Sequence, residues 1–189
     1  AISEGDLNKL RARYADPHTL FHSDPIGDGA SRCEPEAVVF HDSGFAILRT
    51  GSDIETRKHV VLNYGKGNGG HGHKDKLAIN MIAHGYDLSA DLGYPTTFTH
   101  KKVEGWETHT MSHATVCVDG KAQQFATGSL GFTGRTPGTQ ALCATGERAY
   151  PGVADLYRRT VCLVEAKGTE AYLFDVFEVS GGETHDYVF

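Results

Sequence analysis

The stretch that says most about the fold runs over residues 60–83 and reads VVLNYGKGNGGHGHKDKLAINMIA. Its two ends, Val60–Tyr64 and Leu77–Ala83, have the alternating character of β-strands. Between them, glycines at positions 69, 70 and 72 let the backbone bend sharply and approach a ligand closely. The stretch therefore predicts two strands joined by a bent segment that is suited to binding.

Two histidines, His71 and His73, lie in this bent segment. In an extended chain, residues two apart point to the same side, about 7 Å from each other along the strand. Two imidazoles placed in this way could share one metal ion, or one could hold a metal while the other contacts a substrate. The alternative is a surface loop that is simply rich in glycine and histidine, because a short motif is a hypothesis until its context agrees.

The rest of the chain after residue 36 also has a β pattern. Strands are expected near residues 37–41, 44–49, 58–64, 76–84, 86–91, 113–119, 140–148, 157–166, 171–179 and 184–189. The polar segments 92–112 and 120–139 are expected to be loops. Many short strands without helical periodicity predict an all-β fold, an antiparallel β-sandwich of residues 37–189. Residues 1–36 are expected to form a short helix over 3–15 and an irregular linker.

Composition narrows the function. The 189 residues carry a net charge of −6, which argues against a nucleic-acid partner. No apolar run reaches the roughly 20 residues of a membrane span. The four cysteines form no CxxC pair, so a zinc site built from cysteines is not expected. Basic residues do gather in sequence around the two histidines, where they could meet an acidic substrate.

The order of motifs resembles one known family. The HGHKDKL segment is followed by a Gly- and Asp-containing segment that ends in Asp91-Leu92-Gly93, and then by Ser112-His113-Ala114-Thr115-Val116 with Asp119-Gly120. This order resembles the heparinase II/III-like polysaccharide lyases from about Val38 to the C-terminus. The spacing of Trp106 and His113 looks closest to the oligo-alginate lyases, although Ala114 stands where that family usually has Asn.

The resemblance implies a zinc site and a catalytic residue. By motif position, His73, Asp91 and His113 match the family's metal ligands, and His71 matches a histidine that faces the substrate. Considered alone, Asp91 could be a turn residue and His113 a core histidine. His109 is a further candidate ligand.

The reaction that the resemblance implies is β-elimination on a uronate sugar of an acidic polysaccharide or oligosaccharide. The enzyme neutralises the carboxylate, removes the acidified C5 proton and protonates the departing O4. Lys74, Tyr94 and Trp106 are candidate substrate contacts, and Trp106 could equally belong to the core. In the family an N-terminal α/α-toroid domain completes the site, so this chain is expected to be a piece of a larger periplasmic or secreted lyase, cut at both ends.

Two other functions remain open. The first is a noncatalytic carbohydrate-binding or structural sandwich whose metal fixes the loops. The second is a metal-dependent hydrolase, in which zinc needs an open coordination position and a base such as Asp75. Asp75 could instead orient His73.

Overall fold

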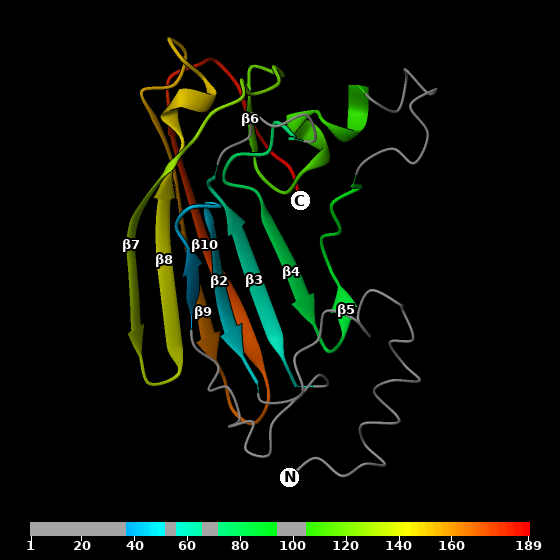
Figure 1. The fold of residues 1–189 in the computed structure, drawn as a ribbon, viewed down its shortest axis with the longest axis vertical. Coiled ribbons are helices and arrows are strands. Elements are labelled where there is room, and N and C mark those ends of the chain that lie inside the picture. The colour runs from blue at the N-terminus through cyan, green and yellow to red at the C-terminus, as the bar shows by residue number, and fades with distance from the viewer. Residues whose placement is uncertain (1–36, 52–55, 66–71, 94–104) are drawn as a thin grey trace. The chain divides into compact units, whose positions relative to one another are not determined.

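The computed structural model describes residues 37–51, 56–65, 72–93 and 105–189 (Figure 1). They belong to one compact unit. The helix expected over residues 3–15 and the linker that follows it lie outside the described residues. Among the residues that the structure describes, none of the helices has the length and apolar character that a bilayer crossing requires.

The first sheet is an antiparallel meander of five strands in the order β1-β2-β3-β4-β5. They span Val38–Phe40, Phe45–Thr50, Lys58–Asn63, Ile79–Ala83 and Tyr86–Asp87. The turn between β1 and β2 ends at Gly44, whose φ is +69°. A Cβ atom there would come within 1.9 Å of the Gly65 Cα atom, so only glycine lets this turn pass the end of β3.

The second sheet has four antiparallel strands in the order β10-β9-β8-β7. They span Ser129–Thr136 (β7), Thr139–Thr145 (β8), Leu156–Glu165 (β9) and Ala171–Ser180 (β10). A smaller ladder pairs β6 (Val116–Val118) with β11 (His185–Tyr187). Short helical turns occur at residues 105–107, at η1 (Thr110–Ser112) and at η2 (Glu147–Ala149).

The two large sheets pack face to face, with β2 against β8 and β9 (Figure 1). Side chains of a strand alternate between its two faces, and the inward side chains of both sheets form the core. The core contains Ala46, Leu48, Val60, Leu62, Leu142, Ala144, Tyr157, Val161 and Leu163. The prediction of an antiparallel β-sandwich is therefore confirmed.

Three local predictions were wrong. The segment 120–139 contains strand β7, which the sequence hides because its side chains are mostly exposed and Gly131 lies at a β-bulge. The strand expected over 76–84 begins only at Ile79, since Leu77 has a φ of +59°. The strand expected over 86–91 ends at Asp87. Each difference arises where the chain bends around the candidate site or runs along a sheet edge.

Candidate metal centre

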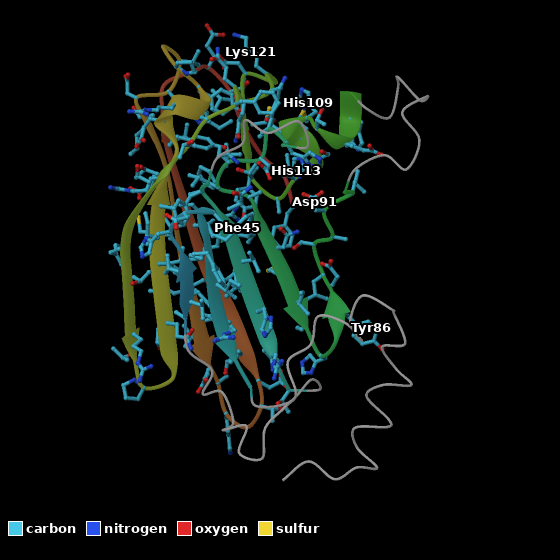
Figure 2. All side chains as sticks on the ribbon, in the orientation of Figure 1. Phe45, Tyr86, Asp91, His109, His113 and Lys121 are labelled. Atoms are coloured by element: carbon cyan, nitrogen blue, oxygen red, sulfur yellow. The ribbon has the colours of Figure 1, made fainter. Side chains whose placement is uncertain are left out.

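His73, Asp91 and His113 come from three separate connections of the fold. His73 lies in the connection between β3 and β4, Asp91 follows β5, and His113 follows η1 just before β6. The Ile79 amide donates to the Ala114 carbonyl at 3.2 Å, which brings the His113 segment against the start of β4. Asp91 and His113 are neighbours in this region (Figure 2). The three side chains thus meet at one end of the first sheet.

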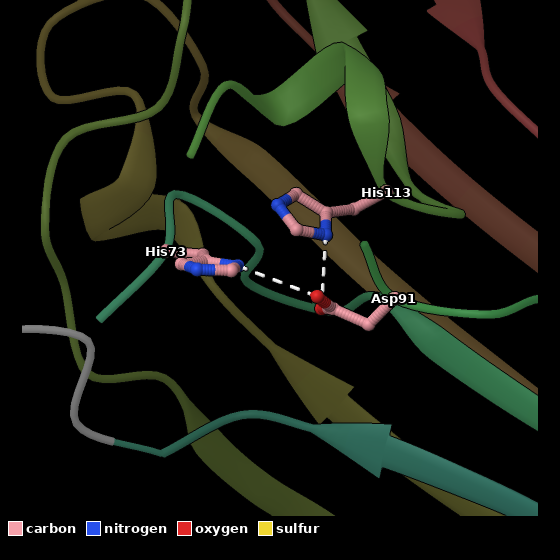
Figure 3. A group of neighbouring side chains, drawn as sticks. All are labelled: His73, Asp91 and His113. Carbon is pink, nitrogen blue, oxygen red and sulfur yellow. Dashed lines mark ion pairs between the residues drawn. The ribbon is translucent and has the colours of Figure 1, made fainter. Parts of the chain in front are cut away.

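The Asp91 carboxylate lies between the two imidazoles (Figure 3). Its Oδ1 atom is 3.5 Å from His73 Nδ1, and its Oδ2 atom is 3.2 Å from His113 Nδ1. The two imidazole rings are 5.1 Å apart between centroids. One imidazole nitrogen from each histidine and one carboxylate oxygen of Asp91 lie within 4.8 Å of one another.

These separations fit a small ion with tetrahedral coordination. Bonds of about 2.0–2.1 Å to nitrogen and oxygen hold the donors of a tetrahedral zinc about 3.3–3.4 Å apart. The two contacts between Asp91 and the histidines, 3.2 and 3.5 Å, lie on either side of that value. Two histidines and one carboxylate are also a donor set that zinc commonly takes. The residues present therefore fit such an ion.

Hydrogen bonds, acting against the effect of burial, set the charge of Asp91 in the site. The side chains of His73 and His113 are 9% and 2% exposed, whereas that of Asp91 is 34% exposed. The hydrogen bond with His113 is the main cause that lowers the pKa of Asp91 to about 2, with help from the Gly93 amide and against the opposing effect of burial. Asp91 is thus a permanent anion at neutral pH, as a metal ligand must be.

The buried His113 Nε2 atom has no hydrogen-bond partner among the described residues. An unpaired buried nitrogen is costly, and such atoms in native structures often mark a bound water or ion. Nε2 lies across the ring from Nδ1, so it is not the atom that an ion between Nδ1 and Asp91 would use. This observation also weakens the alternative that His113 is a satisfied core histidine. The turn interpretation of Asp91 holds at the same time, because Asp91 Oδ1 accepts from the Gly93 amide at 2.7 Å.

A buried polar network fixes the segment that follows His73. The Gln123 side chain accepts from the Lys76 amide at 2.6 Å and donates to the Lys76 carbonyl at 3.0 Å. The Gln123 Nε2 atom also donates to the Tyr157 hydroxyl at 2.8 Å. Thr110 Oγ1 donates to the Lys74 carbonyl at 2.7 Å. The connection that carries His73 is therefore held by groups from β9 and from the segments around β6.

The structure gives His109, the further candidate ligand, and Asp75, the candidate base, other contacts. His109 Nδ1 accepts from the Met111 amide at 3.1 Å and so caps η1. The Asp75 carboxylate accepts from Asn63 Nδ2 at 2.7 Å and pairs with the buried Lys76 Nζ at 2.8 Å. Asp75 is therefore a structural anion that neutralises a buried lysine. These contacts leave Asp75 poorly suited to act as a base for a hydrolase.

Of the residues predicted to contact the substrate, the structure describes Trp106 and Lys74. Trp106 is 52% exposed, so the alternative that it belongs to the core is wrong. It lines a pocket of roughly 380 Å³ together with Asp91 and His113. Lys74 places its ammonium 5.8 Å from the centre of the Phe125 ring. His71 and Tyr94 lie outside the described residues.

Sequence reasoning missed one residue beside the site, the buried Arg159 of β9. The sequence does contain a signal for this residue, because Arg159 occupies a position on the face of β9 that points to the core. The other residues on that face are Tyr157, Val161 and Leu163. A charge in such a position needs a partner inside the protein.

Comparisons with known proteins identify the family of the chain. The family model described as heparinase II/III-like, C-terminal, matches residues 33–189. A comparison with curated protein sequences found no match.

Two solved structures share the fold. A heparinase III gene product has a TM-score of 0.67 at 20% identity over 94% of this chain. The heparan sulfate lyase HepC from Pedobacter heparinus has a TM-score of 0.68 at 17% identity, also over 94% of this chain. In both cases the match covers 27% of the solved chain, so this chain spans about a quarter of their length. Taken with the match over residues 33–189, the chain belongs to the heparinase II/III-like family and corresponds to its C-terminal domain.

Proposed function

We propose that this chain is the sandwich domain of a polysaccharide lyase that cleaves uronate-containing polysaccharides or oligosaccharides by β-elimination, with zinc held by His73, Asp91 and His113. The observation that carries the proposal is the meeting of these three residues in a chain of a lyase family. The solved relatives are named as a heparinase and a heparan sulfate lyase, which supports an acidic polysaccharide as the substrate class.

Each ligand residue has a definite task in this proposal. Asp91 supplies a charged oxygen at neutral pH, because its pKa is far below 7. His73 and His113 supply neutral nitrogens from a largely buried position. Bound zinc supplies positive charge beside the pocket. That charge would favour an anionic substrate, although the whole chain carries a net charge of −6.

We assign His71 to the substrate side of the centre. It lies two residues before His73 in the sequence, and its role is to stabilise the uronate carboxylate or to assist proton transfer. Trp106 offers an exposed ring on which a sugar can stack, in the pocket that also contains Asp91 and His113. Lys74 and Tyr94 are assigned as further contacts with the substrate. The rest of the catalytic machinery is assigned to an α/α-toroid domain of the same enzyme. Because its substrate is a polymer, the enzyme is proposed to work in the periplasm or outside the cell.

A second candidate is a noncatalytic carbohydrate-binding or structural sandwich. The observation that favours it is the burial of His73 and His113, since structural zinc sites are closed by protein groups. In that case the metal would only tie the His73 connection to the His113 segment.

Two measurements separate these candidates. Elemental analysis of the full chain should find about one zinc per chain, and His73→Ala should lose it. Alginate and glycosaminoglycan oligosaccharides are then incubated with the chain and with the intact enzyme. A lyase leaves an unsaturated uronate that absorbs in the near ultraviolet, whereas a binding domain releases no product. Zinc with substrate binding but no product from the intact enzyme would overturn the lyase proposal.

A further inference from the structure

Arg159 lies in the middle of β9, and its side chain points into the sandwich with no exposed surface. A buried guanidinium is costly unless all its N–H groups find acceptors. The structure satisfies this requirement completely, because each of the five N–H groups has its own partner.

One side of the guanidinium is fixed by an acid and by aromatic rings. Nε donates to Asp175 Oδ1 at 3.0 Å, and Nη2 donates to Asp175 Oδ2 at 2.6 Å and to the Tyr187 hydroxyl at 2.8 Å. The guanidinium carbon is 5.3 Å from the centre of the Phe177 ring and 5.6 Å from that of Tyr187. A planar group held along two edges and over two rings has little freedom to move.

The other side of the guanidinium reaches the two segments that carry the histidine ligands. Nη1 donates to the Leu77 carbonyl at 2.7 Å and to the Ala114 carbonyl at 2.6 Å. Ala114 directly follows His113, and Leu77 lies four residues after His73, inside the turn that the Ala78 amide closes by donating to the Asp75 carbonyl. Leu77 also has a φ of +59°, which an L-residue keeps only when its surroundings hold it.

We propose that Arg159 is a positioning residue of the metal centre. Its Nη1 atom fixes the backbone four residues after His73 and directly after His113. The inference rests on the proposed metal centre. Arg159 donates to backbone carbonyls and leaves the imidazoles free for the ion. Its effect is to hold the donor atoms at the spacing that the ion needs before the ion arrives. Loss of this hold therefore lowers metal affinity and changes the coordination geometry.

The test is a titration of the metal-free full chain with Co²⁺, whose visible absorption reports both affinity and coordination geometry. Arg159→Met is expected to weaken binding about tenfold or more, as loss of supporting groups around a metal site does, and to change the spectrum. Arg159→Lys keeps the charge but loses the planar fork, so it should not restore the wild-type spectrum.

The matched control is Arg158→Met on the same strand. Arg158 forms a similar two-bond pair with Glu178 on the opposite, partly exposed face, with both bonds at 2.8 Å. Its loss should leave the affinity and the spectrum unchanged. A residue with a merely structural role would lower the stability of the chain without altering the spectrum of the folded protein.

Each outcome decides something. A wild-type chain that binds no Co²⁺ or Zn²⁺ overturns the metal centre itself. A folded Arg159→Met chain with wild-type affinity and spectrum overturns the positioning role and leaves the centre in place. If circular dichroism shows that Arg159→Met is unfolded, Arg159→Lys replaces it, because it keeps the buried charge and loses the second bond of the fork to the two carbonyls. Wild-type affinity and spectrum in that variant would then overturn the positioning role.

Discussion

The Asp91 Oδ2 atom lies 3.2 Å from His113 Nδ1, a contact that joins the end of the first sheet to the segment that leads into β6. Asp91 reaches His73 with its other oxygen. A single carboxylate therefore organises both imidazoles, and this arrangement determines what each substitution around the site should do.

Substitution of His113 by Ala should abolish zinc binding, with an affinity loss of more than about 100-fold, because it removes one of three ligands together with a buried nitrogen. Calorimetric titration of the metal-free chain measures this loss. The matched control is His109→Ala, which removes an imidazole on the other side of η1. The control should keep full zinc affinity while losing about 1 kcal/mol of stability with the cap. Loss of zinc from the control would place His109 among the ligands.

Acid should reveal the contribution of Asp91 to the stability of the metal-free chain. The ordinary pKa of its carboxyl is 3.8 and folding lowers it to about 2. A carboxyl with a lowered pKa stabilises the fold above its unfolded pKa, and this stabilisation is lost as the pH falls through the folded pKa. Wild type should therefore exceed Asp91→Asn in unfolding free energy above pH 4, by about 1 kcal/mol after allowance for solvent screening. The difference should disappear near pH 2.

Urea unfolding of both proteins between pH 2 and pH 6 measures this difference. A constant difference across that range would show that the charge of Asp91 does not stabilise the metal-free fold. Added zinc should widen the difference at neutral pH, where imidazole can act as a ligand, because only the wild-type protein retains the charged ligand.

Substitution of His71 by Ala should abolish activity of the intact enzyme while leaving about one zinc per chain. The reason is the proposed division of tasks, in which His71 serves the substrate and His73 serves the metal. Product absorbance in the near ultraviolet and elemental analysis of the same sample measure the two properties. Zinc loss in this variant would move His71 into the ligand set.

Removal of the Tyr157 hydroxyl should destabilise the sandwich and loosen the connection that carries His73. This hydroxyl donates to the Val116 carbonyl and accepts from Gln123 Nε2, and burial raises its pKa. Tyr157→Phe removes one hydrogen-bond partner from each of these buried groups, which should cost about 1–3 kcal/mol. Tyr172→Phe, on a 57% exposed residue of β10, is the control and should change stability little. Equal losses in chemical denaturation would contradict the role of the network.

Much of the fold could be predicted from the sequence because strands with one buried face keep an alternating pattern. Val60, Leu62, Tyr157 and Val161 show this pattern and do line the core. The pattern fails for β7, whose side chains are mostly exposed and which contains two glycines. Without a buried face, a strand depends on pairing with its neighbour, and its own residues do not show it.

The sequence by itself determined the class of fold through local periodicity, and the resemblance of its motifs to a known family implied the three residues that meet at the candidate metal centre. Only the tertiary structure decided that Asp91 lies between the two histidines, that Asp75 pairs with Lys76, and that Arg159 joins the Leu77 and Ala114 carbonyls. Apart from the Asp75–Lys76 pair, whose members are adjacent, these contacts link residues far apart in the chain. They depend on strand register and sheet packing, which place distant side chains within the few ångströms over which hydrogen bonds and metal coordination act.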